Sequence, residues 1–597
     1  MKKQIKISKI YHDNIFLFKK IFRYNKKLFF VRLGYAILTS ISSLATVLLP
    51  KYLLEAIMSE NFQNTVHVLA LYFTIAIFIK LLSLCYENYN KGASERMYLQ
   101  IINEFLRKGI ELDLSFFDKS ESYSKYNRAF GNCCDVIERC NNTILSVMTS
   151  LIQIFMLGSI LIGINVYIFI VIIAFIFINI LINNALKKCS HEFRVLLSEK
   201  NKQVNYFYRL FYTPNFIKDI KASSIEKFIF DKKQHVNKDI LDLSQKEIKA
   251  TSKYKILLNA IELIEYVSAA SYFAYMVIIK LISISSYFTS LNAYQQIKNS
   301  ISSLLSAYTA FYDNSLFADD YIDFMKSSEN TTTNTNGILL NSNSIKTITF
   351  SNVTFKYPNA NSYALNNVSF SVNKGDRIAI VGKNGAGKTT LIKLLLRLYD
   401  PDRGEIAING INIKEYDTHS LRSSIVTLFQ DYVIYAFSVY DNIVLGRNIS
   451  SESVEKALAD VGMLEKVNAL NQGINTPISS QLYSGGIEFS GGEAQKIAIS
   501  RVFCSALPVF VLDEPTSSLD PYSEYKLYSQ LLDSSNKDKT FMVVSHRLTF
   551  THKMSNILVL ENGIITESGT HEELMRKNGT YAEMYKLQAE KFNGIET

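Results

Sequence analysis

Residues 382–389 read GKNGAGKT and lie between an apolar run and the helix-like run LIKLLLRL. Glycines at such a turn allow backbone N–H groups to surround phosphate oxygens, and the following helix N-terminus adds positive potential. We expect Lys388 to neutralise the outer phosphates and the Thr389 hydroxyl to bind Mg²⁺. A structural glycine turn is the alternative, but the strand–loop–helix context favours a nucleotide site. The predicted phosphate-binding residues are Gly382, Lys383, Asn384, Gly385, Ala386, Gly387, Lys388, Thr389 and Thr390.

Two further motifs carry candidate chemistry. Residues 509–514, VFVLDE, predict a strand that ends in two acids. Asp513 suits Mg²⁺ coordination through water, and Glu514 is placed to polarise an attacking water, although a solvated acidic turn is the alternative. Residues 489–496, FSGGEAQK, offer either a second anion-binding helix N-terminus or a plain helix cap.

The order of these motifs resembles the ATP-binding domain of ABC transporters over about residues 345–587. The phosphate-binding loop at residues 382–389, here called the P-loop, comes first. It is followed by Gln430, the Ser-Gly-Gly-Glu signature, LDE, SSLD and His546. The usual signature of that family is LSGGQ, and this chain has Phe489 and Glu493 at the two positions that differ.

The resemblance implies roles for single residues, with ATP and Mg²⁺ as cofactors. Tyr357 would stack on adenine, and Gln430 would contact Mg²⁺ and the attacking water. Glu514 would be the catalytic base, and His546 would contact the γ-phosphate. Asp520 would link two ATP sites across a dimer. The predicted metal-binding residues are Thr389, Gln430 and Asp513.

The signature implies a second subunit. It would bind ATP held by the opposite P-loop, and one chain supplies one signature and one P-loop. We therefore expect a homodimer that encloses two ATP molecules, with a heterodimer of two half-transporters as the alternative. The residues expected to act in trans are Ser490, Gly491, Gly492 and Glu493.

The elements before the P-loop predict a membrane domain. A bilayer-spanning helix takes roughly 20 mostly apolar residues. The second and fourth apolar segments are followed by polar, helix-periodic connections of more than 50 residues, which predict long helical extensions. The six predicted spans are residues 28–55, 66–88, 144–164, 166–186, 256–279 and 286–311.

Basic residues set the predicted orientation. Residues 58–65 carry no Lys or Arg, whereas residues 187–202 carry five. The positive-inside rule then places both termini and the ATPase domain in the cytosol, at the cytoplasmic membrane. The net charge of +10 would also suit nucleic acid, but the basic residues lie beside the apolar segments, so we expect a lipid bilayer and no nucleic acid as partner.

The predicted fold class is an all-α six-helix transmembrane domain with long cytosolic extensions, followed by an α/β P-loop ATPase domain. The N-terminal segment, which precedes the first predicted span, mixes aromatic and aliphatic residues with lysines. This composition predicts a helix that lies on the inner leaflet of the membrane. The linker is rich in Ser, Thr and Asn. The predicted boundaries are 1–27 for the interfacial segment, 28–325 for the transmembrane domain, 326–346 for the linker, 347–587 for the ATP-binding domain and 588–597 for the tail.

Residues 112–129 and 216–223 resemble the two coupling helices of exporters, which dock on the ATPase domain. Residues 479–486 replace the acidic TEVGE-like loop of many exporters by SSQLYSGG, which leaves the detailed coupling contact open.

Ionisable residues inside spans are costly and often functional. Glu262 and Glu265 are spaced i, i+3 on the fifth span, and Gln295, Gln296 and Lys298 lie on the sixth. We expect the two glutamates to face the substrate cavity and to meet a cationic or hydrogen-bonding cargo. The alternative is that they pair with a lysine or with polar neighbours.

The predicted function is ATP-driven export by alternating access. The cargo that we expect first is a peptide. Lipid flipping and multidrug efflux are the alternatives for the cargo. A non-transport ATPase is disfavoured because the motifs are continuous and follow six spans, and an importer because both domains are fused in one chain. An ATP-gated channel on the same scaffold stays open.

Overall fold

The structure is a computed structural model that describes residues 7–164, 167–326, 334, 336–516, 519–531, 538–548 and 550–593. The chain forms two compact units. The first comprises Met1–Phe105 and Arg128–Phe324, and the second comprises Leu106–Asn127 and Met325–Thr597. The segment Leu106–Asn127 is therefore grouped with the C-terminal unit, although its sequence lies inside the predicted transmembrane domain.

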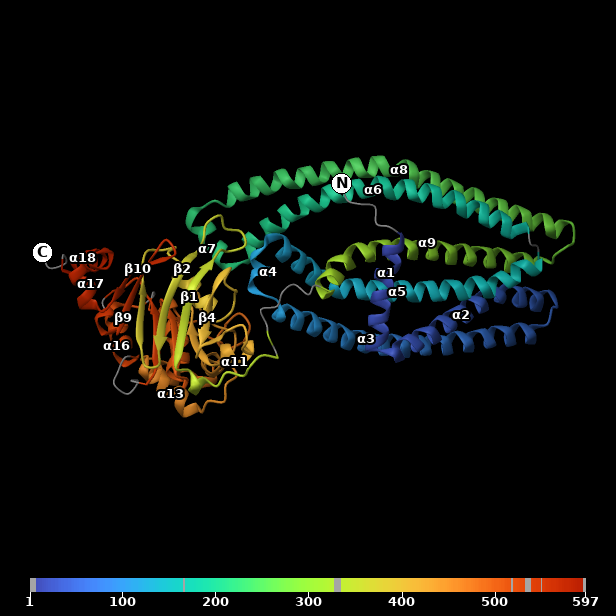
Figure 1. Ribbon diagram of the computed structural model, residues 1–597. Coiled ribbons are helices and arrows are strands. Elements are labelled where there is room, and N and C mark those ends of the chain that lie inside the picture. Colours follow the sequence, from blue (N-terminus) through green and yellow to red (C-terminus); the bar gives the residue numbers. More distant parts are fainter. Residues whose placement is uncertain are drawn as a thin grey trace. The chain divides into compact units, whose positions relative to one another are not determined.

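The first unit consists of helices over its described residues (Figure 1). Six of these helices are long, each overlaps one predicted span, and most continue well beyond it, so the predicted helical extensions are present. The helices are α1 (Ile7–Tyr24), α2 (Lys26–Met58), α3 (Phe62–Glu111), α5 (Ser120–Ile164), α6 (Tyr167–Tyr212), α7 (Pro214–Ser223), α8 (Glu226–Ile278) and α9 (Ile284–Lys326).

Within the described residues, four helical stretches are long and apolar enough to cross a membrane. They are Lys26–Met58, Phe62–Glu111, Asp135–Ile162 and Glu226–Ile278. The predicted turn between the third and fourth spans includes Asn165, which lies outside the described residues. The count of six spans therefore stays a prediction.

Two long helices, α6 and α8, lie side by side along the first unit (Figure 1). Polar side chains join them in the part beyond the predicted spans. The Lys200 ammonium lies 2.6 Å from Asp239, and the Ser190 hydroxyl donates to Glu247 at 2.6 Å. These bonds tie the two extensions into one antiparallel pair.

The N-terminal helix α1 packs one face on α9. Asp13 is buried there and accepts a hydrogen bond from the Ser315 hydroxyl at 2.5 Å, while Lys9 pairs with Asp319 at 2.6 Å. The same face buries Leu17 and Ile21. The predicted helix is thus present, and its position on the inner leaflet stays a prediction.

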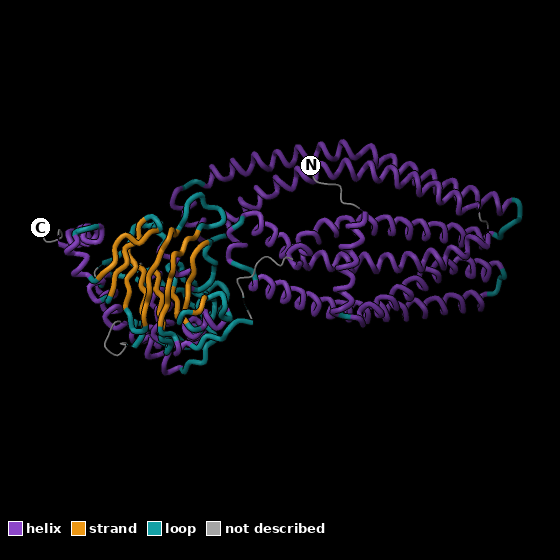
Figure 2. Tube along the Cα trace, viewed as in Figure 1, coloured by secondary structure: helices purple, strands orange, loops and turns teal. Residues whose placement is uncertain are grey.

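The second unit contains two β-sheets flanked by helices (Figure 2). The larger sheet has the strand order β10-β9-β3-β8-β7-β6, and all its pairs are parallel except β9 with β10. The strands are β3 (Arg377–Val381), β6 (Ile425–Leu428), β7 (Val509–Asp513), β8 (Thr540–Val544), β9 (Asn556–Glu561) and β10 (Ile564–Gly569).

The smaller, antiparallel sheet has the order β2-β1-β4-β5. Its strands are β1 (Thr347–Phe355), β2 (Leu365–Asn373), β4 (Arg403–Ile408) and β5 (Ile411–Asn412). The helices of this unit are α4 (Leu114–Asp118), α10 (Lys388–Leu395), α11 (Thr418–Ser423), α12 (Val439–Val444), α13 (Ser451–Asp460), α14 (Leu464–Asn468), α15 (Gly491–Phe503), α16 (Pro521–Leu531), α17 (His571–Lys577) and α18 (Thr580–Asn593).

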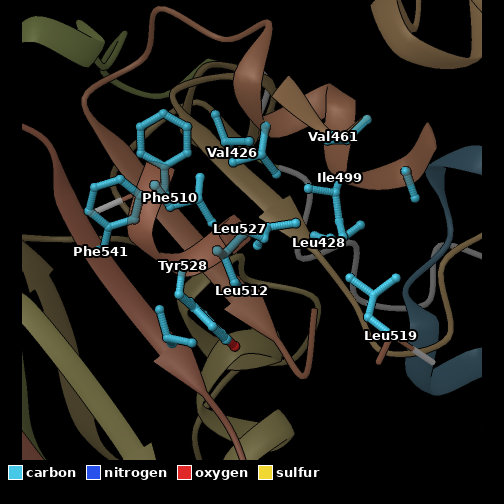
Figure 3. Packing of buried hydrophobic residues seen from close by; sticks show 14 of the residues in the cluster. Val426, Leu428, Val461, Ile499, Phe510, Leu512, Leu519, Leu527, Tyr528 and Phe541 are labelled. Carbon is cyan, nitrogen blue, oxygen red and sulfur yellow. The ribbon is translucent and has the colours of Figure 1, made fainter. Parts of the chain in front are cut away.

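The parallel strands are apolar on both faces because a hydrophobic core covers each face. Successive residues of a strand point to opposite sides. In β7, Phe510 and Leu512 enter the core under α15 and α16, whereas Val509 and Val511 enter the core beneath the smaller sheet and α10. Figure 3 shows the first of these cores, in which Phe510 stacks on Phe541 at a centroid distance of 5.0 Å.

The short helix α4 docks on the ATP-binding part of the second unit through its last residue. The Tyr399 hydroxyl donates to Asp118 Oδ2 at 2.5 Å, and the Asn359 amide donates to the Asp118 carbonyl at 2.9 Å. The predicted first coupling stretch thus forms a short helix with two hydrogen bonds to this domain.

The structure shortens the predicted linker of residues 326–346. Ile338 forms a β-bridge with Tyr416, and its N–H donates to Glu415 O at 2.9 Å. Leu340 is buried in the core beneath the smaller sheet. The apolar trio Ile338, Leu339 and Leu340 explains this difference, because it lies within a segment whose overall composition is polar.

Candidate nucleotide-binding site

Four neighbouring parallel strands bring the predicted site residues to one edge of the larger sheet. The P-loop follows β3, Gln430 follows β6, Glu514 follows β7 and His546 follows β8. These strands are adjacent in the order β3-β8-β7-β6. The carboxyl ends of parallel strands meet at one edge, which is where α/β sheets bind ligands.

The P-loop needs its glycines. Gly387 has φ +106°, and a Cβ atom there would lie 2.4 Å from the Ala364 carbonyl oxygen. The loop leads into α10, whose first residue Lys388 is buried and donates from Nζ to the carbonyls of Gly382 at 2.8 Å and Lys383 at 3.0 Å. Burial lowers the pKa of Lys388, and the nearby Glu514 and Asp513 carboxylates oppose that shift.

A cavity of about 610 Å³ lies over this edge. Its lining comes from the P-loop, from the strand ends and from the loop between β1 and β2. The lining residues predicted from the sequence are Tyr357, Asn384, Gly385, Gly387, Lys388, Thr389, Thr390, Gln430, Glu514 and His546. Of the residues predicted to bind the nucleotide on their own P-loop, four do not line it, namely Gly382, Lys383, Ala386 and Asp513.

Sequence reasoning missed one wall of the cavity. Ala360, Ser362, Tyr363 and Ala364 line it from the loop that follows Tyr357. These residues carry no motif, and the signal that would have found them is their position directly after the tyrosine expected to meet the base.

Tyr357 is fixed at the cavity wall by its neighbours. Its hydroxyl lies 3.1 Å from the Thr390 hydroxyl, and Tyr399 meets its ring in an edge-to-face contact at 5.3 Å. Such aromatic pairs hold a ring in one orientation. A flat, positioned aromatic side chain beside the phosphate loop is what base stacking requires.

Three polar side chains converge at the ends of β6, β7 and β8. The Gln430 amide donates to Glu514 Oε2 at 2.9 Å, and His546 Nε2 contacts Glu514 Oε1. Burial raises the pKa of Glu514 and lowers the pKa of His546. These shifts favour the uncharged imidazole of His546 and make the Glu514 carboxylate more basic, as a general base requires.

Asp513, at the end of β7, fits a divalent cation. Its carboxylate is buried, and burial raises its pKa, while the Thr389 hydroxyl lowers it. Neither carboxylate oxygen has a well-formed hydrogen bond among the described residues. Buried unpaired oxygens are costly, and Mg²⁺ takes oxygen ligands and water, so Thr389 and Asp513 together suit this ion.

The signature residues begin helix α15. Ser490 is its N-cap, and its backbone N–H donates to Glu493 Oε2 at 3.1 Å in a capping box. Glu493 also pairs with Lys466 at 2.5 Å, which lowers its pKa. No residue of the signature lines the cavity over the P-loop. The Glu493 carboxylate is therefore engaged by its own chain, and its expected contact with ATP stays a prediction.

Asp520 lies at the start of α16 and accepts a hydrogen bond from the Ser523 N–H at 2.9 Å. Hydrogen bonds from the side chain and the backbone of Ser523 lower the pKa of Asp520. A role of Asp520 between two subunits stays a prediction.

The ionisable residues of α8 and α9 form a cluster in the first unit. Lys298 Nζ lies 3.1 Å from Glu262 and 3.4 Å from Glu265, and the Tyr294 hydroxyl donates to Glu265 at 2.8 Å. Glu265 is buried, whereas the side chain of Glu262 is 58% exposed. The two glutamates thus pair with a lysine, as the alternative interpretation expected, and Glu262 also remains accessible. Nearby on α9, the Gln295 amide lies 3.5 Å from Asn299, and the Gln296 carbonyl accepts from Ser300.

Fold and site together define a P-loop ATPase fused behind a helical transmembrane unit. Residues 365–517 match the family model described as ABC transporter, and residues 29–300 match the model described as ABC transporter transmembrane region. The chain belongs to the ABC transporters, has the fused organisation of an exporter half-transporter, and couples ATP hydrolysis to transport.

Individual relatives agree with this assignment. The subtilin transport ATP-binding protein SpaT of Bacillus subtilis is 26% identical over 579 residues, which are 95% of this chain and 92% of that protein. The ATP-dependent lipid A-core flippase of Blochmanniella pennsylvanica is 37% identical over 243 residues, 40% of this chain and 41% of that one. A bacterial Atm1-family ABC exporter with ATP bound has the same fold, with a TM-score of 0.77 at 21% identity over 94% of this chain and 98% of that one.

The position of Glu514 predicts the behaviour of Glu514→Gln. The amide cannot accept a proton from water, so we expect ATPase turnover to fall by about 10²- to 10⁴-fold, while ATP binding persists because the P-loop is unchanged. Turnover and equilibrium ATP binding of the full-length protein measure this. Glu583→Gln, an exposed carboxylate of α18, is the control. Wild-type turnover of Glu514→Gln would show that another group activates the water.

Proposed function

We propose that this protein is a homodimeric exporter that uses ATP to move a peptide out of the cytosol across the cytoplasmic membrane. The observation that carries the peptide assignment is the match with SpaT, which extends over 95% of the chain and is named for subtilin transport. The match with the lipid flippase is higher in identity but covers 40% of the chain. A match that covers both domains is better evidence for the cargo than a match that covers less than half of the chain.

The chain's own geometry supports a dimer that shares its nucleotides. A nucleotide on the P-loop meets Lys388, Gln430, Glu514 and His546 in the cavity, but the signature of the same chain does not reach that cavity. The exposed N-terminus of α15 would instead bind the ATP of the partner subunit. Each subunit has both a complete P-loop and a signature, so both sites of a homodimer are complete.

Each residue at the site has a separate task in this proposal. Tyr357 stacks on the base, and Lys388 binds the outer phosphates. Thr389 and Asp513 hold Mg²⁺, which when bound neutralises phosphate charge. Glu514 takes a proton from the attacking water, which Gln430 orients.

Transport itself tests the proposal. In inside-out vesicles that contain the protein, we expect ATP-dependent accumulation of a peptide cargo, and in lipid we expect members of a peptide panel to stimulate ATPase activity. The same panel includes lipids and amphiphilic dyes. Stimulation by a lipid alone would make the protein a flippase, and stimulation by dyes alone a drug exporter. Accumulation without hydrolysis, tested with Glu514→Gln, would indicate a gated channel.

The cluster of Glu262, Glu265 and Lys298 is our proposed cargo contact. It consists of two glutamates and one lysine, and one of the two glutamates, Glu262, is exposed. For a cationic peptide we expect Glu262→Gln to raise the cargo KM about two- to fivefold, since an exposed ion pair contributes up to about 1 kcal/mol. Glu55→Gln is the control, because this glutamate of α2 accepts from Ser285 in the same unit. An unchanged cargo KM would remove Glu262 from the site.

The bonds of α4 predict a role in coupling. Asp118→Ala removes the carboxylate that accepts from Tyr399 and keeps the backbone carbonyl that accepts from Asn359. A hydrogen bond to a charged group contributes about 1.5–3 kcal/mol. We expect cargo stimulation of the ATPase to fall at least about fivefold, with basal turnover within about twofold of wild type. Glu121→Gln, whose partner is Lys125, is the control. Full stimulation of Asp118→Ala would exclude this contact from coupling.

A further inference from the structure

The segment after β6 connects the catalytic carboxylate to the signature helix. At its start, the Gln430 amide donates to Glu514 Oε2 at 2.9 Å. Two residues later, the Tyr432 hydroxyl donates to the Gly491 carbonyl at 3.1 Å. Only Asp431 separates Gln430 from Tyr432, so the two hydrogen bonds are joined by a short stretch of backbone.

The rest of the segment is anchored to the body of α15. Arg501 donates from Nη2 to the Val433 carbonyl at 2.7 Å and from Nε to the Asn442 carbonyl at 2.8 Å. The ring of Tyr432 packs against the hydrophobic core that contains Ile497 and Ile499 of α15. Arg501 thus connects the segment after β6 to the C-terminal part of α15. Tyr432 connects the same segment to Gly491, the first residue of α15.

Gly491 occupies the position from which α15 would bind an anion. The capping box engages the Ser490 N–H, whereas the N–H groups of Gly491 and Gly492 precede the first intrahelical bond and are available to a phosphate. A Cβ atom at Gly491 would meet nothing within 4 Å in its own chain. The space beside Gly491 is therefore open within its own chain.

We propose that Tyr432 is a positioning residue that links the two ATP sites of the dimer. Gln430 and Glu514 serve the ATP on their own P-loop, whereas Gly491 of the same subunit serves the ATP of the partner. The Tyr432–Gly491 hydrogen bond joins these two roles within one chain. The inference rests on the proposed dimeric ATP sandwich and adds the residue through which one site influences the other.

A hydrogen bond of this kind also stabilises the fold, so the test needs a matched control. Tyr440 lies in α12, and its hydroxyl donates to the Ile449 carbonyl at 2.6 Å. Like Tyr432, it is partly buried against the same core. Tyr440→Phe and Tyr432→Phe thus lose the same chemical group and the same type of bond, but only Tyr432 contacts the signature.

The experiment measures ATP occlusion in the full-length protein in lipid. In a Glu514→Gln background, radiolabelled ATP is bound and its release is followed after dilution. We expect Tyr432→Phe to release occluded ATP about two- to tenfold faster than Tyr440→Phe, the range for loss of one neutral hydrogen bond. Affinity for ADP, which needs only the P-loop side, stays unchanged. In proteins that retain Glu514, the Hill coefficient for ATP falls toward 1 in Tyr432→Phe alone.

Two negative results are distinguishable. If Tyr432→Phe and Tyr440→Phe release ATP at the same rate and keep the same Hill coefficient, Tyr432 is only a structural brace and the inference is wrong. If the Glu514→Gln protein without further changes occludes no ATP, the shared-site proposal itself is wrong.

Discussion

The interaction on which the structure depends is the binding of a polyanionic phosphate chain at one edge of a parallel sheet. β3, β8, β7 and β6 end there side by side, and the loop of each strand contributes one functional group. The cations and N–H groups come from the P-loop, and the carboxylates come from β7. This arrangement leaves a cavity that is open toward one side and contains no signature residue. A single chain thus provides the P-loop side of the proposed hydrolysis site but not its signature side.

Polar and aromatic contacts link the site to the remainder of the second unit. Glu514 accepts a hydrogen bond from Gln430 and contacts His546, so these three side chains form one polar network at the strand ends. That network continues through Tyr432 to the signature helix on one side. On the other side, the base platform Tyr357 contacts Tyr399, which in turn holds Asp118 of α4. These contacts connect the candidate site to elements that lie beyond the cavity lining.

The candidate ATPase residues could be found from the sequence because they are contiguous with strand ends, and their roles stay predictions. The P-loop, Glu514 and His546 each follow an apolar strand directly, so the sheet topology brings them together. The cavity wall from Ala360 to Ala364 was not predictable. Its residues line the cavity because their loop lies beside it, and no sequence motif marks them. The linker was predicted too long because its composition conceals Leu340, which is buried. The pairing of Glu262 and Glu265 with Lys298 needed the packing of α8 against α9, which spacing along one helix does not specify.

The central claim is that each ATP is bound between the P-loop of one subunit and the signature of the other. Subunit complementation tests it most directly, with ATP occlusion measured in the Glu514→Gln background. Lys388→Ala removes the P-loop cation, and Gly491→Leu places a side chain where the subunit itself has open space. The account predicts that neither variant occludes ATP alone and that dimers mixed from the two variants occlude one ATP. Occlusion by Gly491→Leu alone, or none in the mixed dimers, would contradict it.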